Sequence, residues 1–164
     1  MGEARKVRGA GTRLHQGIRT GLDALRNPGS PLSVLIAEDD QVTSRTMGLM
    51  IAWEFPHLTV DTVDNGERGV ELFRQRLPDI VIADLDLPGK DGLQMAAEIK
   101  TLKKETPLIV VTGCSDRTQL ARLCEIGVNH CILKPYKVQE LFAAIESCIA
   151  QLTKETDVRS YTLF

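Results

Sequence analysis

Hydrophobic and polar residues form two kinds of pattern along the chain from Ser33 onward. Short apolar runs, typical of strands buried on both faces, alternate with longer segments in which apolar residues recur at helical spacing. The run 58–63 alternates with polar residues and predicts a weaker strand. The short runs are residues 33–37, 58–63, 79–84, 107–113 and 130–134. The helical segments are residues 41–55, 65–76, 92–104, 115–127 and 137–152.

Five strand–helix units in succession predict a parallel sheet with helices packed on both of its faces. Crossovers between parallel strands are right-handed, so the helices must divide between the two faces of the sheet. The fold class expected is therefore α/β, with a doubly wound, five-stranded parallel sheet at the centre of three layers.

The two ends of the chain stand apart from this pattern. Residues 1–32 are predicted to be a basic, flexible N-terminal extension and linker, because they close with the proline- and glycine-rich sequence RNPGSPL (residues 26–32). A leucine and isoleucine stripe there suggests a short helix, but two glycines weaken such a helix by about 1 kcal/mol each. The domain itself is expected to cover residues 33–152 and a C-terminal tail residues 153–164.

Several local signals refine the expected elements. The first helical segment carries Val42, Met47, Met50, Ile51 and either Trp53 or Glu54 at broadly helical spacing. In the fourth helical segment, Ser115 is a candidate for the N-terminal cap and Gly127 is a natural C-terminal stop.

Charge and cysteine content exclude some classes of protein. Residues 1–33 hold six basic and two acidic residues, a net charge of +4, so the remainder carries −6 of the overall −2. An acidic body argues against direct nucleic-acid binding. No apolar stretch is long enough to span a membrane and no signal peptide is apparent, so a cytoplasmic location is expected.

The four cysteines lie in apolar surroundings and show no metal-binding spacing. They are Cys114, Cys124, Cys131 and Cys148. We expect them to be reduced, buried thiols.

Polar residues gather where the predicted strands end. The first strand runs directly into Glu38, Asp39 and Asp40, and the third ends at Asp84. The fourth strand ends at Thr112 and the fifth at Lys134. In open α/β sheets, ligands bind beyond the carboxyl ends of the strands, so these side chains mark the expected site.

Four motifs in this order resemble those of the receiver domains of two-component response regulators. They are VLIAEDD (residues 34–40), PDIVIADLDLPGKDG (78–92), LIVVTG (108–113) and ILKPY (132–136). The resemblance covers residues 33–152, and it implies a flavodoxin-like fold with strand order 2-1-3-4-5.

The resemblance also implies a role for each residue at the strand ends. Asp84 matches the phosphoacceptor, whose carboxylate attacks a phosphoryl group. Glu38 and Asp39 match the acidic pair that, with Asp84 and the backbone carbonyl of Asp86, holds Mg²⁺, a cation that prefers hard oxygen ligands. This cation explains why like charges are crowded at the end of a buried strand. Asp40 is left over and is expected to cap the following helix.

Three further positions complete the implied machinery. Thr112 matches the hydroxyl that hydrogen-bonds a phosphoryl oxygen, and Lys134 matches the cation that pairs with the phosphoryl group. The bond from Lys134 to Pro135 is cis in the family. Cys131 stands at the switch position, where the family usually has an aromatic residue that couples to the threonine.

The function implied is a signalling switch without an external substrate of its own. It would receive a phosphoryl group on Asp84 from a histidine kinase or a histidine phosphotransfer protein, with Mg²⁺, and would then change the surface that a downstream protein partner binds. Its catalysis would be limited to its own phosphorylation and dephosphorylation. The residues after Leu152 are too few for a helix-turn-helix unit, so no DNA-binding output is expected.

An enzyme remains as the alternative: a magnesium-dependent phosphohydrolase of the aspartyl-phosphate type. It requires a second acid two residues after the nucleophile, and Asp86 occupies that position. Such enzymes also carry a cap domain over the substrate, and no insertion here is long enough. Turnover of a generic phosphate ester would discriminate the two functions.

Overall fold

The computed structural model describes residues 31–113 and 115–161, with side chains described as far as Glu155. The expected N-terminal extension, its linker and Cys114 therefore lie outside the described residues, apart from Pro31 and Leu32.

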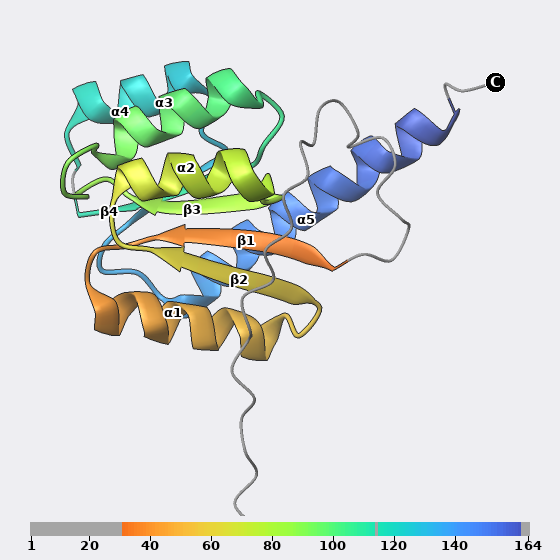
Figure 1. The fold of residues 1–164 in the computed structure, drawn as a ribbon, viewed down its shortest axis with the longest axis horizontal. Helices are drawn as coiled ribbons and strands as arrows, with labels where there is room; N and C mark the ends of the chain where they lie inside the picture. The colour runs from red at the N-terminus through yellow and green to blue at the C-terminus, as the bar shows by residue number, and fades with distance from the viewer. Residues whose placement is uncertain (1–30, 114, 162–164) are drawn as a thin grey trace, which may run out of the picture. The chain divides into compact units, whose positions relative to one another are not determined.

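Five parallel strands form one sheet, as the apolar runs predicted. The strands are β1 (Leu32–Ala37), β2 (Leu58–Val63), β3 (Ile80–Asp84), β4 (Leu108–Thr112) and β5 (His130–Leu133). Their order across the sheet is β2-β1-β3-β4-β5, and every pair is parallel (Figure 1). The predicted fold class and the strand order implied by the resemblance are both confirmed.

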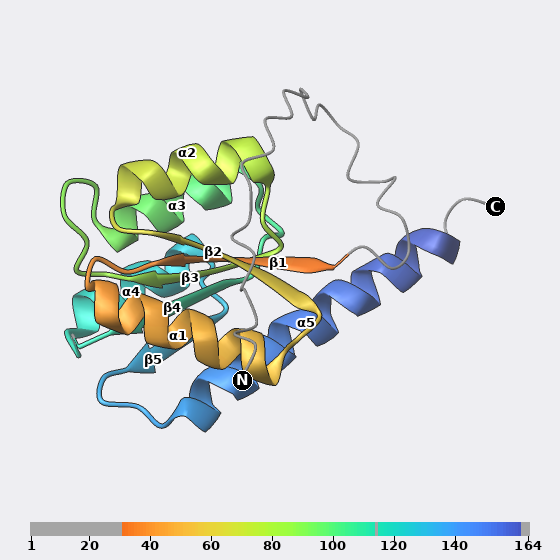
Figure 2. The ribbon, with the colours of Figure 1, turned by 60° about the horizontal axis from the view of Figure 1, so that its bottom comes forward.

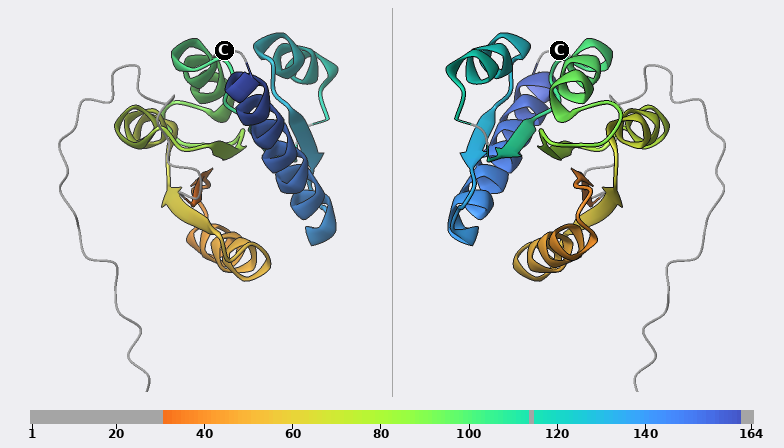
Figure 3. Two further views of the ribbon diagram at one scale, coloured as in Figure 1. Left: turned by 90° about the vertical axis from the view of Figure 1, so that its right-hand side faces the viewer. Right: turned by 90° about the vertical axis from the view of Figure 1, so that its left-hand side faces the viewer.

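Helices cover both faces of the sheet. They are α1 (Gln41–Glu54), α2 (Gly66–Arg76), α3 (Gly92–Leu102), α4 (Arg117–Ile126) and α5 (Val138–Tyr161). Helices α1 and α5 lie on one face, and α2, α3 and α4 lie on the other (Figures 1 and 2). The end-on views in Figure 3 show the same three layers.

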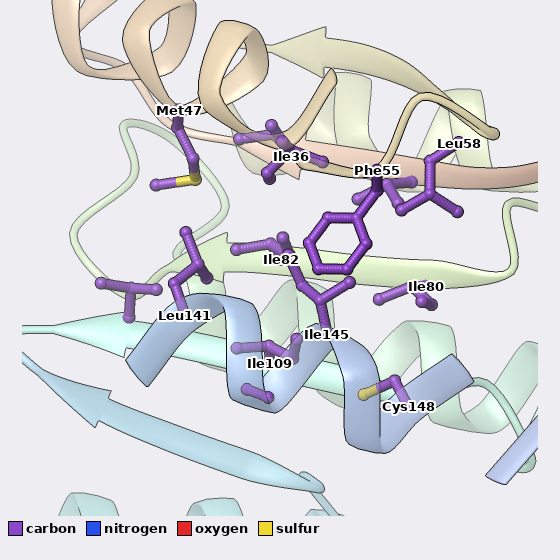
Figure 4. Close-up of a cluster of buried hydrophobic side chains, with 14 of the residues drawn as sticks. Ile36, Met47, Phe55, Leu58, Ile80, Ile82, Ile109, Leu141, Ile145 and Cys148 are labelled. Carbon is purple, nitrogen blue, oxygen red and sulfur yellow. The ribbon is translucent and has the colours of Figure 1, made fainter. Parts of the chain in front are cut away.

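The core consists of two apolar layers that share the strands. Along β1, Val34 and Ile36 face the α1–α5 side, and Leu35 and Ala37 face the α2–α3 side. This alternation follows from the two-residue period of a strand, and it explains why all four residues from Val34 to Ala37 are apolar. Figure 4 shows the layer between α1, α5 and the sheet, in which Phe55, directly after α1, packs with the other apolar side chains.

Helix α1 buries a narrower face than its sequence indicated. Only Ser44, Met47 and Ile51 are buried, whereas Val42 is 75% exposed and Trp53 is 88% exposed. The reason is that α1 packs beside β2, the edge strand of the sheet, and its outer side meets no further element among the described residues. A large apolar residue at helical spacing therefore did not identify the buried face.

The helix caps agree with the sequence in two of three places. Asp40 caps α1, and its Oδ1 accepts a hydrogen bond from the N–H of Thr43 at 2.7 Å, as expected. Gly127 ends α4 with a positive φ of 89°, also as expected. The prediction for the start of α4 was wrong by one position, because Asp116 rather than Ser115 accepts the hydrogen bond from Thr118.

Among the three cysteines that the structure describes, the prediction of a buried thiol is confirmed only for Cys148. Cys124 and Cys131 are exposed. Cys131 lies on β5, the other edge strand, where only Ile132 is buried. An edge strand can carry apolar residues without a partner layer over each of them.

Helix α5 continues to Tyr161, beyond the predicted end at Leu152. Its extension is polar and has no apolar face that a hydrophobic pattern could detect. Local bonds accompany it instead: Thr153 Oγ1 donates to the carbonyl of Ile149 at 2.9 Å, and Gln151 donates to Glu155 at 3.3 Å. Among the helices of the described part of the chain, none is long and apolar enough to cross a membrane.

Candidate functional site

The carboxyl ends of four neighbouring strands place polar side chains at one edge of the sheet. Glu38 follows β1, Asp84 ends β3, Thr112 ends β4, and Lys134 directly follows β5. Glu38, Asp84 and Thr112 are all buried. The backbone N–H of Lys134 donates to the carbonyl of Thr112 at 2.8 Å, which holds the end of β5 against β4.

Lys134 joins two buried carboxylates. Its Nζ donates to Oδ2 of Asp84 and lies 3.6 Å from Oε2 of Glu38. The other oxygen of Asp84, Oδ1, accepts a hydrogen bond from the N–H of Asp86 at 2.9 Å. Both oxygens of Asp84 are therefore held in position, one by a cation and one by the backbone of the following loop.

The electrostatics of the site reflect this crowding. Burial raises the pKa of Glu38, and the nearby charge of Asp84 adds to the increase, although a hydrogen bond from the N–H of Asp40 and the charge of Lys134 oppose it. Burial lowers the pKa of Lys134, but the hydrogen bond to Asp84 and the charges of both carboxylates outweigh burial, so its pKa is raised overall. The lysine is thus held firmly in its charged form by the two acids.

The remaining predicted residues lie around this centre. Asp39 and Asp86 are exposed beside it, and Asp40 is used as the helix cap. Within the described ranges, no three histidine, cysteine or acidic side chains are grouped closely enough to hold a metal ion. The donors at the site are nevertheless hard oxygens, and Glu38 and Asp84 share a single lysine. This donor set fits a divalent cation such as Mg²⁺.

Cys131 and Thr112 lie on the same face of the sheet. Val110, which packs with Leu123 of α4, is the register partner of Cys131, and Thr112 is two residues further along β4 and is the partner of Leu133. Because strand residues two apart point to the same side, Cys131 and Thr112 are diagonal neighbours on the α4 side. The bond between Lys134 and Pro135 is cis, as expected.

Sequence reasoning missed how the loop after Asp84 is held. A Cβ on Gly92 would lie 2.0 Å from the carbonyl oxygen of Asp84, and a Cβ on Gly66 would lie 2.0 Å from that of Lys90. Glu67 accepts a hydrogen bond from the N–H of Lys90 at 2.8 Å. The loop is therefore packed between the bare backbones at the starts of α2 and α3. Gly92 opens the predicted helical segment 92–104 and Gly66 is the second residue of the segment 65–76, which was the available signal.

The fold and the strand-end site together define a three-layer α/β domain with a buried acid–lysine centre. Residues 34–146 match the model of the response regulator receiver domain, so the chain belongs to this family of two-component signalling domains.

Individual relatives agree with this assignment. The chain is 33% identical over 113 residues to the probable C4-dicarboxylate response regulator DctR of Bacillus subtilis, which covers 69% of this chain and 50% of the relative. It is 28% identical over 123 residues to the probable chemotaxis protein CheY of Rhizobium etli, which covers 74% of this chain and 95% of the relative. The chain thus spans about half the length of some curated relatives and nearly all of another.

Solved structures show the same fold. A response regulator receiver domain protein from Clostridium thermocellum superimposes with a TM-score of 0.70 at 22% identity, covering 74% of this chain and 97% of that structure.

Proposed function

We propose that this domain is a phosphoacceptor switch that receives a phosphoryl group on Asp84 from a phosphohistidine of a histidine kinase or a histidine phosphotransfer protein. The observation that carries the proposal is the buried carboxylate of Asp84, held by Lys134 on one oxygen and by the N–H of Asp86 on the other. A carboxylate so oriented can attack phosphorus as a nucleophile. The new bond joins an Asp84 oxygen to phosphorus, and the phosphorus–nitrogen bond of the donor breaks.

The neighbouring residues suit the charge that develops in this transfer. Lys134 can leave the carboxylate oxygen for the incoming phosphoryl oxygens, because it is already at the site in its charged form. Thr112 lies at the next strand end and can donate its hydroxyl proton to a phosphoryl oxygen. Neither residue needs a new backbone arrangement to be near the reaction.

Mg²⁺ is the proposed cofactor. Glu38, Asp39 and Asp84 would hold it through their carboxylates, and Asp86 through its backbone carbonyl. When bound, the cation neutralises charge on the transferring phosphoryl group. The raised pKa of Glu38 supports this assignment, since burial, together with the nearby charge of Asp84, disfavours the ionised carboxylate in the absence of a bound cation.

Signal output would follow from a change of surface near Thr112 and Cys131, which a downstream protein partner reads. We propose a cytoplasmic location and no direct binding of nucleic acid by this domain. Catalysis would be confined to gain and loss of its own phosphoryl group. The phosphohydrolase alternative is not favoured, because the loop from β3 to α3 covers only residues 85–91 and has no room for a cap domain.

Labelling tests the proposal directly. With Mg²⁺ and acetyl phosphate, the protein is expected to gain one phosphoryl group that is stable in acid and labile in base. Asp84→Asn should abolish the gain, because an amide is neither anionic nor nucleophilic, and Asp86→Asn is the matched control that should retain it. Undiminished labelling of Asp84→Asn would overturn the assignment. Sustained hydrolysis of a generic phosphate ester would favour the enzyme instead.

A further inference from the structure

Two exposed thiols flank the turn that joins α4 to β5. Cys124 lies in the last turn of α4, shortly before Gly127, and Cys131 is the second residue of β5. Both cysteines are free and exposed, whereas Cys148 is free and buried. The proposed transfer of a phosphoryl group to Asp84 uses neither of the exposed thiols, so the pair is open to a chemistry of its own.

The turn between the two cysteines reverses the direction of the chain. Gly127 ends α4 with a φ of 89°, and its N–H donates to the carbonyl of Cys124 at 3.0 Å. The N–H of Asn129 then donates to the carbonyl of Leu108 at 2.9 Å, which fixes the start of β5 beside β4. In a strand–helix–strand unit the helix runs back against the direction of the strands, so residues just before this turn lie beside residues just after it.

The side chain of Cys131 lies on the face of the sheet that α4 covers. Ile132 packs in the layer of α1 and α5, so its neighbour Cys131 points to the opposite face. Val110, the register partner of Cys131, packs with Leu123 of α4 (Figures 2 and 3). Cys124 directly follows Leu123 in the helix. Both thiols therefore lie at the margin where α4 covers the edge strand.

The two thiols also affect each other electrostatically. Burial raises the pKa of Cys131, and the charge of a Cys124 thiolate raises it further. A surface charge acts in this way on a near neighbour, which agrees with the placement of both cysteines at one margin of α4. The raised pKa keeps the thiol of Cys131 protonated at neutral pH and makes it a poorer nucleophile than an ordinary cysteine. Cys131 is thus suited to the second step of an oxidation that begins at Cys124.

Helix α4 is held loosely enough to adjust its position over β5. The structure describes every residue of α4, and only Leu123 is buried, whereas four residues of α3 are buried. A disulfide requires the two Cα atoms to lie within about 7 Å of each other. A helix that is anchored by one buried side chain can shift against the sheet at a low cost, so α4 can bring its last turn to the distance that such a bond needs.

We propose that Cys124 and Cys131 form a redox site, in which hydrogen peroxide produces an intramolecular disulfide that ties α4 to β5. The thiolate of Cys124 attacks one oxygen of the peroxide, the oxygen–oxygen bond breaks, and the departing hydroxide takes up a proton to become water. The sulfur of Cys131 then attacks the resulting sulfenic acid, the sulfur–oxygen bond breaks, and a second water leaves with the proton of the thiol. Two thiols are oxidised and one peroxide is reduced to two waters. A small thiol reductant reverses the reaction.

The tie would hold the surface that we propose changes on phosphorylation. Thr112 lies diagonally beside Cys131 on the α4 side, so a disulfide there would oppose any movement of α4 that follows phosphorylation of Asp84. This consequence rests on the proposed function. The disulfide itself does not, because its formation requires neither Mg²⁺ nor a phosphoryl group.

Mass spectrometry of the full chain tests the proposal. The reduced protein is treated with hydrogen peroxide, alkylated and digested. Trypsin leaves both cysteines on one peptide, residues 123–137, because the bond between Lys134 and Pro135 resists the enzyme. This peptide should lose two hydrogens in mass and escape alkylation. A further cut after Glu125 separates the two cysteines, and its two fragments should stay joined until a reductant is added. A peptide that is fully alkylated, or that carries only a sulfenic acid, would overturn the proposal.

Substitutions identify the two partners of the bond. Cys124→Ser and Cys131→Ser should each abolish the disulfide, because each removes one of its two sulfur atoms. Cys114→Ser is the matched control and should form the disulfide within about twofold of the rate of the unaltered protein. A disulfide that includes Cys114, or a disulfide-linked dimer as the main product on a non-reducing gel, would show that the two thiols of one chain do not pair with each other.

Hydrogen exchange tests whether the bond restrains α4. Amides in the last turn of α4, over residues 123–127, should exchange at least about tenfold more slowly in the oxidised protein than in the reduced one, because the disulfide opposes the opening of this turn. Amides of α1 should exchange at the same rate in both forms. Peroxide-treated Cys131→Ser is the control and should show no slowing. Unchanged exchange in α4 of the fully oxidised protein would overturn the tie between the helix and the strand.

Discussion

Two partly buried lysines, one at each end of the sheet, differ in the partners that surround them. Lys134 lies at the carboxyl edge and contacts the carboxylates of Asp84 and Glu38. Lys100 lies at the opposite edge, and its Nζ donates to neutral oxygens, with the carbonyl of Thr106 at 2.8 Å the shortest of three bonds. Their pKa values shift in opposite directions: the hydrogen bond to Asp84 and the charges of both carboxylates raise that of Lys134, and burial lowers that of Lys100.

The contrast separates a reactive arrangement from a structural one. Neutral carbonyls around Lys100 tie the end of α3 to the starts of β4 and β5, where Asn129 also accepts from the N–H of Leu108 at 2.9 Å. Such bonds stabilise the fold and offer nothing to a phosphoryl group. Two carboxylates around one lysine instead leave unbalanced negative charge, which a cation or a change of partner can relieve.

Replacing Lys134 should have the largest effect on the reaction. Lys134→Met removes the cation that faces the transferred group, so labelling by acetyl phosphate is expected to slow at least about 100-fold. The effect on the free energy of unfolding should be small, a change of roughly 1–2 kcal/mol, because Glu38 can take up a proton when its counter-ion Lys134 is lost. Timed labelling and urea unfolding measure the two effects. Normal labelling would remove Lys134 from the site.

Replacing Lys100 should lower the stability of the fold without slowing the labelling reaction. Lys100→Met deletes the three hydrogen bonds of Nζ and leaves carbonyl oxygens unpaired, so the unfolding free energy should fall by about 1–2 kcal/mol. Labelling should stay within twofold of the unaltered protein. Lys154→Met, at an exposed lysine of α5, is the matched control and should change neither quantity. A large loss of labelling in Lys100→Met would break the distinction between the two edges.

The buried carboxylates at the carboxyl edge of the sheet should also affect how the stability of the fold depends on pH. The pKa of Glu38 is raised in the folded protein, so folding favours its protonated form. That contribution is fully present below the pKa of the unfolded chain and is lost as the pH rises through the higher folded pKa. Without divalent cations, Glu38→Gln should therefore gain stability relative to the unaltered protein between pH 4 and pH 7. Urea unfolding across this range would contradict the expectation if the difference stayed constant.

The smallest effect is expected at Cys131. A thiol has less bulk than an aromatic ring and no hydroxyl, so it neither blocks nor fills a pocket as the threonine moves. Cys131→Ala should keep the gain in partner affinity on phosphorylation within about threefold, under roughly 0.7 kcal/mol of coupling. Affinities of both phosphorylation states in both proteins measure this. A collapse of the gain would identify the thiol as the moving part.

The sequence was informative where the residue types are compatible with only one kind of environment in the fold. Apolar runs such as β3 must be buried on both faces, so the strands could be predicted from them, whereas their order came from the resemblance to receiver domains. Asp84 and Lys134 were identifiable because each stands at the carboxyl end of a predicted strand, in a motif that resembles the receiver family, and the structure brings the two side chains into direct contact. The contact between Lys134 and Glu38 could not be predicted, because it depends on how far β5 lies from β1 across the twisted sheet.

Prediction failed where the identity of a residue does not determine its surroundings. Trp53 and Cys131 are apolar in character and exposed in fact, because each lies near an edge of the sheet where the covering layer ends. The extension of α5 beyond Leu152 was not predicted, for a related reason. Its residues are good helix formers without an apolar stripe, so only local bonds accompany the helix there.

The two glycines that hold the loop after Asp84 have a consequence for protein engineering. Gly66 and Gly92 leave no space for even one methyl group, since each ideal Cβ would overlap a backbone oxygen. In a library that samples every amino acid, these two positions should tolerate a single residue type. Exposed loop positions such as Asp86 and Pro88 should accept many folded variants. New binding specificities are therefore best introduced at the tip of this loop, while its two glycine supports are left unchanged.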